Sequence, residues 1–299
     1  MSTVSIATIN TEPFIGMQVG TATITEELAR GGMAIVFVAF QRTLKRKIAL
    51  KVLPKSLLTP ETADLFQQEA EAAAILAHPN IIPVYEVGET DEFLFFTMQL
   101  VEGNTLAEYL KAAEKNIIPS KRILPLPITL KLIIQVLDAL DYAHRQDIVH
   151  RDIKPGNVLI EKHSQRPLIT DFGIVQIMRS KDDSKPIVHG TPLYMPPEQV
   201  LGRNVDGRAD IYATGTVLFQ MLVKELPLPA FKSKLVLLKQ KLLQKDGIYL
   251  KKPSEVNPNL HEDMDRIVAR ALAYDPSERY ATCADFQKDL ENYSRKHLP

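Results

Sequence analysis

The sequence predicts an α+β protein in which a strand-rich first part is followed by a mostly helical second part. Short β-prone runs bounded by turn residues dominate the first hundred positions, whereas long helical stripes dominate the remainder. The 299 residues, 45% of them apolar, suit either one large domain or two lobes with separate cores. We therefore expect two lobes of different secondary structure, preceded by a loosely ordered lead-in over residues 1–19.

The first part is expected to contain five strands and one helix. Thr59 can cap the helix, and Pro60 suits its first turn. One of the strands carries a single lysine, Lys51, among apolar residues. The expected strands are Thr21–Leu28, Ile35–Phe40, Ile48–Leu53, Ile81–Val87 and Phe93–Val101.

Glu69 lies on the apolar face of this helix. It follows Phe66 by three positions and precedes Ala73 by four and Leu76 by seven. An inward carboxylate is costly unless it meets a cation, and Lys51 is the natural partner.

The second part is expected to be helical, with one helix that is apolar on most sides at Arg208–Val223. Leucines and lysines interleave in a further helix, and we expect those lysines to form a solvated amphipathic face. A surface for membranes or acidic substrates is the alternative. The other expected helices are a stripe over Leu130–Leu140, then Leu235–Gln244, Glu262–Leu272 and Ala281–Tyr293; the lysines are Lys232, Lys234, Lys239, Lys241 and Lys245.

Composition excludes several classes of protein. The net charge is zero, so no general affinity for nucleic acid or anionic membranes is expected. Cys283 is the only cysteine, which excludes an intrachain disulfide and a two-cysteine zinc site. No apolar run is long enough to span a bilayer, and the first basic residue is Arg30, so we expect neither a membrane span nor a secretory leader.

The most informative segment is His150–Asn157, followed by Asp171-Phe172-Gly173. It places two carboxylates, an amide and an amine close together in the chain. One carboxylate can accept the proton of an attacking hydroxyl. The other, with an amide oxygen, can hold Mg²⁺, and the amine can meet charge on a phosphate in flight.

This segment resembles the catalytic loop and metal-binding turn of protein kinases. The resemblance implies that Asp152 is the catalytic base, that Lys154 faces the transferring phosphate, and that Asn157 and Asp171 bind Mg²⁺, or Mn²⁺ in its place. It extends over residues 20–295 and implies a bilobal kinase fold. The kinase domain would cover 20–299, with an N-lobe at about 20–100, a C-lobe at about 104–295 and ATP in the cleft between them.

The turn from Leu28 to Val36 resembles the glycine-rich loop that covers the ATP phosphates, whose pattern is G-x-G-x-x-G-x-V. Gly31 and Val36 match, whereas Ala29 and Ala34 replace the first and third glycines. The resemblance also implies that Lys51 and Glu69 form the pair that holds the ATP phosphates. The residues assigned to ATP are Leu28, Ala29, Arg30, Gly31, Gly32, Met33, Ala34, Val36, Ala49, Lys51, Glu69, the gatekeeper Met98, the hinge residues Gln99 and Val101, and Leu159.

The segment Gly190–Glu198 resembles the peptide-docking segment of protein kinases, with Pro196 in place of an alanine. The resemblance implies that the Thr191 hydroxyl braces Asp152 and Lys154, and that Glu198 forms a buried pair with Arg279. Lys154 is typical of kinases that act on serine and threonine.

Arg151 implies control by phosphorylation, because a phosphate on the activation segment pairs with this arginine in kinases that carry it. Between Asp171 and Thr191 the only hydroxyl residues are Ser180 and Ser184, so we expect autophosphorylation there. Activation without phosphate is the alternative.

The predicted function is transfer of the γ-phosphoryl group of Mg-ATP to serine and threonine of proteins, including the chain itself. Four short segments resemble the bacterial eukaryotic-like kinases, which implies a cytoplasmic location, free or as part of a membrane-anchored parent. They are Gly31-Gly32-Met33-Ala34, His78–Ile81, Asp210-Ile211-Tyr212 and Pro197-Glu198-Gln199. Whether the chain forms a homodimer is left open by the sequence. The alternatives are a pseudokinase scaffold that binds nucleotide and, third, a small-molecule phosphotransferase, against which Gly190–Glu198 argues.

Overall fold

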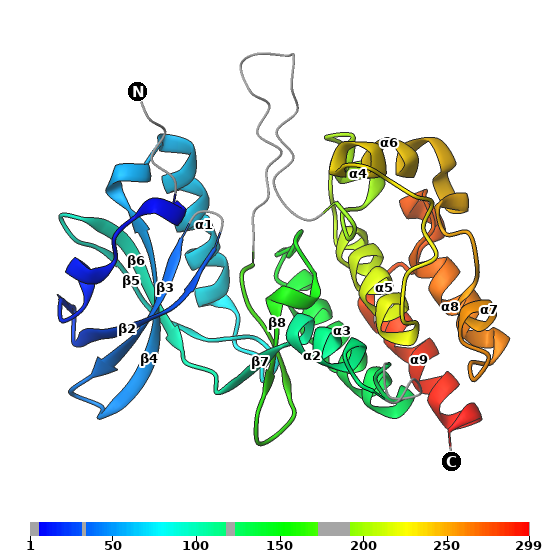
Figure 1. The fold of residues 1–299 in the computed structure, drawn as a ribbon, viewed down its shortest axis with the longest axis horizontal. Helices are drawn as coiled ribbons and strands as arrows, with labels where there is room; N and C mark the ends of the chain where they lie inside the picture. The colour runs from blue at the N-terminus through cyan, green and yellow to red at the C-terminus, as the bar shows by residue number, and fades with distance from the viewer. Residues whose placement is uncertain (1–5, 32–33, 118–122, 173–191, 299) are drawn as a thin grey trace. The chain divides into compact units, whose positions relative to one another are not determined.

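The computed structural model describes residues 6–31, 34–117, 123–172 and 192–298. The chain divides into two compact units, Met1–Glu102 and Gly103–Pro299. The first unit is built on a sheet and the second is mostly helical (Figure 1), which confirms the predicted α+β class. No helix among the described residues has the length and apolarity needed to cross a membrane.

The first unit contains a six-stranded antiparallel sheet with the order β1-β2-β3-β4-β6-β5 and one long helix, α1. The expected strands are present with shifted ends. The elements are β1 Gln18–Val19, β2 Ala22–Arg30, β3 Ile35–Gln41, β4 Arg46–Pro54, α1 Pro60–Ile75, β5 Val84–Glu89 and β6 Phe93–Gln99.

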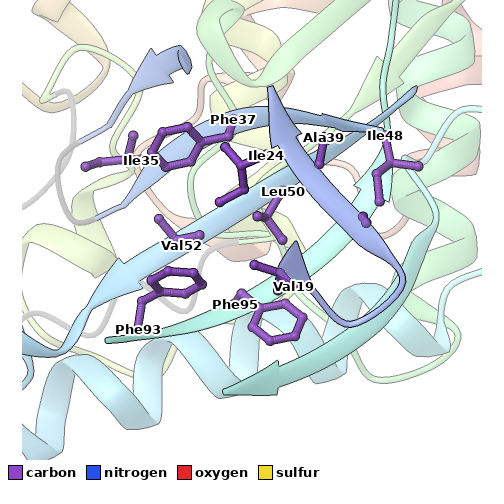
Figure 2. Close-up of a cluster of buried hydrophobic side chains, with 11 residues drawn as sticks. Val19, Ile24, Ile35, Phe37, Ala39, Ile48, Leu50, Val52, Phe93 and Phe95 are labelled. Carbon is purple, nitrogen blue, oxygen red and sulfur yellow. The ribbon is translucent and has the colours of Figure 1, made fainter. Parts of the chain in front are cut away.

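One face of this sheet carries the hydrophobic core of the unit (Figure 2). Alternate residues of β3 and β4 point into it, including Phe37 and Leu50, and Phe93 joins from β6. Because side chains alternate along a strand, the residues between them lie on the opposite face, where Lys51 is found.

The N-terminal segment differs from the predicted lead-in. Residues 6–19 contain two short 3-10 helices, Ile6–Thr8 and Glu12–Phe14, and then β1. Phe14 packs edge-on against Phe37 and Phe93, with ring centroids 6.0 and 5.5 Å away. The apolar side chains of this segment have no helical or strand period, but they cover the sheet, so the expectation of a loosely ordered segment was wrong for residues 6–19.

The second unit begins with a small sheet of β7 Gly103–Thr105, β8 Val158–Glu161 and β9 Pro167–Ile169. Gly103 is required there, because a Cβ atom would lie 2.0 Å from the carbonyl oxygen of Ile160. The helices are α2 Leu106–Glu114, α3 Leu126–His144, α4 Pro197–Val200, α5 Arg208–Leu222, α6 Lys234–Gln244, α7 Pro253–Val256, α8 Glu262–Ala271 and α9 Cys283–His297.

Helix α5 is the centre of this unit, and α3 and α8 pack against it while α9 lies along α3 (Figure 1). Almost every residue of α5 is buried, as its apolar sequence predicted. Helix α6 corrects one expectation. Its lysines do not all lie on a solvated face, because the Lys241 side chain is 1% exposed.

Candidate active site

The predicted glycine-rich turn joins β2 to β3 as a hairpin. The Gly31 amide donates to the Ala34 carbonyl at 2.8 Å, and Ala29 pairs with Val36 across the strands. Leu28 and Ala29 are exposed, whereas Ala34 is buried. Gly32 and Met33 lie outside the described residues. The hairpin therefore forms with alanine at both departures from the family pattern.

The Arg30 side chain serves the N-terminal segment. Its guanidinium donates to both carboxylate oxygens of Glu27, at 2.6 and 2.9 Å, to the Thr11 hydroxyl at 3.2 Å and to the carbonyls of Ile6 and Ile9. These contacts occupy the guanidinium, so any part that Arg30 plays in phosphate binding falls to its main chain.

Four residues assigned to ATP share one face of the first sheet. Val36 of β3 lies directly opposite Lys51 of β4, and Ala49 of β4 lies opposite Met98 of β6. Directly opposed residues in an antiparallel sheet have side chains on the same side, as do residues two apart along a strand. Ala49 and Met98 are buried and Val36 is half-buried, so together with Lys51 these four side chains offer an apolar surface with one amine.

Lys51 and Glu69 form the expected ion pair. Lys51 Nζ lies 2.5 Å from Glu69 Oε1, with the two side chains 13% and 10% exposed. Helix α1 is held on this face of the sheet by Phe66, whose ring lies 5.2 Å from that of Phe96. The pair is formed in the structure, and its role in holding ATP stays a prediction.

The remaining residues assigned to ATP are Gln99, Val101 and Leu159. The Gln99 amide at the end of β6 donates to the Pro83 carbonyl at 3.2 Å, and Val101 is half-buried two residues later. Leu159 belongs to the second unit, where it pairs with Thr105 and Leu168 in the small sheet and is half-buried.

The catalytic-loop residues are brought together within the second unit. Lys154 Nζ donates to Asp152 Oδ2 at 2.5 Å, and Asn157 Nδ2 donates to the same oxygen at 3.0 Å and to the Asp152 carbonyl at 2.9 Å. Pro155–Asn157 forms one 3-10 turn that leads directly into β8. An amine, a carboxylate and an amide are thereby fixed in one cluster.

The loop is held by a buried carboxylate whose role in the site was not predicted from the sequence. Asp210 of α5 is 0% exposed and accepts hydrogen bonds at 2.8 Å from the main-chain amides of His150 and Arg151 and from His144 Nε2. Burial opposes the charge of Asp210, but its bonds to His144 outweigh burial and lower the pKa of the carboxyl group. Asp210 thus fixes the backbone just before Asp152.

His150 links the predicted catalytic loop to the turn at Asp171, which is expected to bind the metal. Its Nδ1 accepts from the Asp152 amide at 3.2 Å and its Nε2 lies 3.0 Å from the Thr170 carbonyl, so the ring is the Nε2-protonated tautomer. The ring packs at 4.7 Å from that of Phe172. His150 is fully buried and holds these two segments together.

Two residues of the site have left-handed backbone. Arg151 has φ of 65° and Asp171 has φ of 57°. Such values are uncommon for residues other than glycine and persist only where the surroundings impose them. Within the described residues, Arg151 Nε is buried without a hydrogen-bond partner. Ser180, Ser184 and Thr191 lie outside the described residues, so the structure does not test their assigned roles.

The predicted pair of Glu198 and Arg279 is present and buried. Arg279 Nη1 and Nη2 donate to the two carboxylate oxygens of Glu198 at 2.7 and 2.8 Å. Gln199 follows Glu198 and donates to the Arg151 carbonyl at 3.2 Å, which connects the docking segment to the catalytic loop.

Asp210, His144 and Gln199 are the supporting residues that sequence reasoning missed. Asp210 carried a usable signal, because a carboxylate in a helix that is apolar on most sides has to find a buried partner. Neither His144 nor Gln199 had such a signal, since their partners lie 66 and 48 residues away in the chain.

Comparison with known proteins agrees with this geometry. The family model for the protein kinase domain matches residues 22–290. The chain is 36% identical over 272 residues to a probable serine/threonine-protein kinase, SCO3848, of Streptomyces coelicolor, covering 88% of this chain and 38% of that protein. It is 32% identical over 295 residues to the tyrosine-protein kinase MasK of Myxococcus xanthus, covering 93% of this chain and 44% of that protein.

Among solved structures, the PknI kinase domain of Mycobacterium tuberculosis matches with a TM-score of 0.71 and 28% identity, covering 93% of this chain and 98% of that chain. The chain spans about two fifths of the length of the curated relatives it matches. The kinase prediction is confirmed at the level of family and fold, and the chain belongs to the protein kinase domain family.

Proposed function

We propose that this chain is a serine/threonine protein kinase that transfers the γ-phosphoryl group of Mg-ATP. The cluster of Asp152, Lys154 and Asn157, held by the buried Asp210, carries this proposal. A nucleotide-binding scaffold has no need of a base, an amine and an amide within hydrogen-bonding distance of one another. Phosphoryl transfer needs that arrangement, because it depends on position and on charge neutralisation.

In the proposed mechanism Asp152 is the general base. Lys154 and Asn157 both donate to Asp152 Oδ2, so Oδ1 is the oxygen assigned to the substrate hydroxyl. As the hydroxyl oxygen attacks the γ-phosphorus in line, its proton passes to Asp152, the bond to the β-phosphate oxygen breaks and ADP leaves. Lys154 stabilises the charge on the transferring group. A charge fixed in position stabilises the transition state more than freely oriented water does.

The donor atoms suit a divalent cation that prefers oxygen. The amide nitrogen of Asn157 is used by Asp152, so its amide oxygen is the atom assigned to the cation, together with the Asp171 carboxylate. When bound, Mg²⁺, or Mn²⁺ in its place, supplies positive charge that neutralises the phosphate oxygens. Lys51, oriented by Glu69, is assigned to the α- and β-phosphates.

The substrate class rests on two features of the chain. Lys154, two residues after the base, and the segment leading to Glu198 both match kinases that act on serine and threonine. SCO3848 is named as a kinase of that class, whereas MasK is named as a tyrosine kinase. Tyrosine phosphorylation is therefore the alternative that the first experiment has to exclude.

The test is phosphoryl transfer from labelled Mg-ATP to a generic basic protein, followed by identification of the labelled amino acid. We expect label on serine and threonine, reduced at least about 100-fold in Asp152→Asn. Asp147→Asn is the matched control, because it removes the same charge from an exposed residue five positions earlier. Label on tyrosine alone would overturn the substrate class.

The same assay separates the remaining alternatives. If the wild-type chain binds ATP without labelling protein above the Asp152→Asn level, the pseudokinase scaffold is correct, and Ala29 and Ala34 are its first explanation. If only a metabolite is labelled, the chain is a small-molecule phosphotransferase.

Autophosphorylation is proposed at Ser180 and Ser184, with Arg151 as the partner of the phosphate. The support is the buried Arg151 Nε, which no group in the described ranges satisfies. Mass spectrometry of active enzyme after incubation with Mg-ATP tests this. Active enzyme with both serines unmodified would contradict the proposal and favour activation without phosphate.

A further inference from the structure

Lys241 of α6 is a buried lysine that the proposed mechanism does not use. Its side chain is 1% exposed, although its neighbours Lys239 and Lys245 lie in solvent. Leu237 and Leu238, four and three residues earlier, are buried as well, so Lys241 lies on the inner face of the helix. Lysine is almost never fully buried without partners that repay the loss of hydration.

The partners of Lys241 are two main-chain carbonyls in the docking segment. Nζ donates to the Leu193 carbonyl at 2.6 Å and to the Met195 carbonyl at 2.9 Å. Both residues precede α4, and Met195 is itself buried. One side chain thus ties two alternate residues of an irregular segment to a helix more than forty positions away.

The pair of Glu198 and Arg279 is buried close to Lys241, on the same tyrosine ring. Lys241 Nζ lies 5.1 Å from the centre of the Tyr212 ring, and the Arg279 guanidinium carbon lies 4.9 Å from it. Burial first, and then the charge of Arg279, lower the pKa of Lys241 to about 7, against the opposing effect of Glu198. Both protonation states can donate to the two carbonyls, because even the neutral amine keeps two N–H groups.

We propose that Lys241 is a positioning residue that sets the conformation of the segment Pro192–Met195, through which the enzyme binds its protein substrate. The proposal rests on the proposed function as a protein kinase. It assigns Lys241 to the affinity for the protein substrate, separate from ATP binding and from the chemical step, since none of its partners belongs to the catalytic cluster.

The geometry favours this role over plain filling of the core. An apolar side chain would fill the same space more cheaply, whereas lysine carries donors to the places where two carbonyls need them. Without Lys241, those carbonyls would be buried with no partner from α6, and the segment would rearrange to reach water. A rearranged docking segment binds peptide less well while the catalytic cluster stays intact.

The test compares Lys241→Met with Lys239→Met, the same change at an exposed position of the same helix. Steady-state kinetics are measured with a basic protein substrate and, separately, with ATP as the varied substrate. We expect Lys241→Met to raise KM for the protein about tenfold, the usual scale for one charge-assisted hydrogen bond, with KM for ATP and kcat changed less than twofold. Lys239→Met should match the wild type.

A second measurement does not need activity. Hydrogen exchange by mass spectrometry should show faster exchange of amides in residues 193–203 in Lys241→Met and unchanged exchange in Lys239→Met. If exchange in Lys241→Met stays as slow as in the wild type while KM for the protein rises, the proposal is wrong. If the wild type transfers no phosphate to protein, the proposed function fails, and the exchange result alone then decides whether Lys241 holds this segment.

Three outcomes would overturn the proposal. The first is unchanged exchange in Lys241→Met, and the second is an unchanged KM for the protein. The third is a fall in kcat together with a similar rise in KM for the protein and for ATP, which would indicate a general structural role. If Lys241→Met does not fold, Lys241→Gln replaces it, because glutamine keeps one donor group. Its KM for the protein should be higher than that of the wild type, by less than the tenfold expected for Lys241→Met.

Discussion

The two units of the molecule each contain a buried ion pair, and the two pairs are built differently. Arg279 uses five N–H groups, two on the Glu198 carboxylate and three on the carbonyls of Ala273, Arg208 and Tyr274. Lys51 Nζ lies 2.5 Å from Glu69 Oε1. The Arg279 side chain is 0% exposed, whereas that of Lys51 is 13% exposed.

This difference suits Arg279 to a structural role and Lys51 to a role in binding a ligand. A guanidinium whose donors are all satisfied by one rigid pocket is fixed, because any movement breaks several bonds at once. An ammonium is a compact charge on a flexible stem, and one that keeps some contact with solvent can meet a second anion such as a phosphate. We therefore expect mutation of the first pair to reduce stability and mutation of the second to reduce activity.

The largest effect on stability is expected for Arg279→Leu. The change leaves the Glu198 carboxylate buried without its cation and should lower the free energy of unfolding by about 3–5 kcal/mol. Chemical denaturation measures it, with the exposed Arg203→Leu as a control that should lie within about 0.5 kcal/mol of the wild type. A loss below about 1 kcal/mol for Arg279→Leu would break the comparison.

Lys51→Met should have the opposite profile. Lys51 lies nearer to solvent than Arg279, with side chains 13% and 0% exposed, so its removal leaves a carboxylate that water can reach, and we expect a loss of about 1–2 kcal/mol in stability. Phosphoryl transfer should fall at least about 100-fold, because a fixed cation at the phosphates is lost. Denaturation and the labelling assay measure the two effects, with Lys47→Met, an exposed position on the same strand, as control. Equal losses in stability for Lys51→Met and Arg279→Leu would contradict the distinction.

The contribution of Lys241 to the stability of the second unit should depend on pH. Its pKa is about 7 when folded and 10.5 in the reference state, so the unfolded chain binds more protons between these values. Stability should therefore rise with pH in this window, relative to Lys241→Met, by at most about 1.4 kcal/mol per pH unit. Unfolding of both proteins at pH 7 and pH 9 tests this. A difference that does not change with pH would show that the lysine keeps its ordinary pKa.

The smallest effect is expected at the pair of His144 and Asp210, whose charge itself depends on pH. Burial alone would lower the pKa of His144, but Asp210 outweighs burial and raises it above 6.5. The pair should stabilise fully below pH 6.5 and weaken as pH rises through the raised pKa. His144→Gln should thus cost more stability at pH 5.5 than at pH 8.5. The exposed His163→Gln is the control variant. A cost of His144→Gln that is the same at both pH values would show that folding does not shift the pKa of His144.

Local sequence pattern predicted those parts of the fold whose signal is local. The cap and proline at Thr59 and Pro60 mark the start of α1, which begins at Pro60 and has its Thr59 cap in place. The helical periodicity placed Glu69 on the inner face and so predicted its partner, Lys51. The same argument applied to α6 would have found Lys241, three and four residues after two buried leucines.

The prediction failed where the signal was not periodic. Residues 6–19 show neither the helical nor the strand period, yet Phe14 packs on two aromatic rings of the sheet. Burial of such a segment depends on an apolar surface that exists only after the strands have assembled.

The sequence by itself determined the family and the order of the main strands and helices, and it pointed to the cluster of Asp152, Lys154 and Asn157 that we propose as catalytic, because these depend on residue type and on spacing over a few turns. Only the tertiary structure decided which buried groups meet. Asp210 bonds the amides of His150 and Arg151, and Lys241 bonds the carbonyls of Leu193 and Met195. Main-chain groups look alike in every residue, so their partners are set by the path of the chain, which spacing along the sequence does not record.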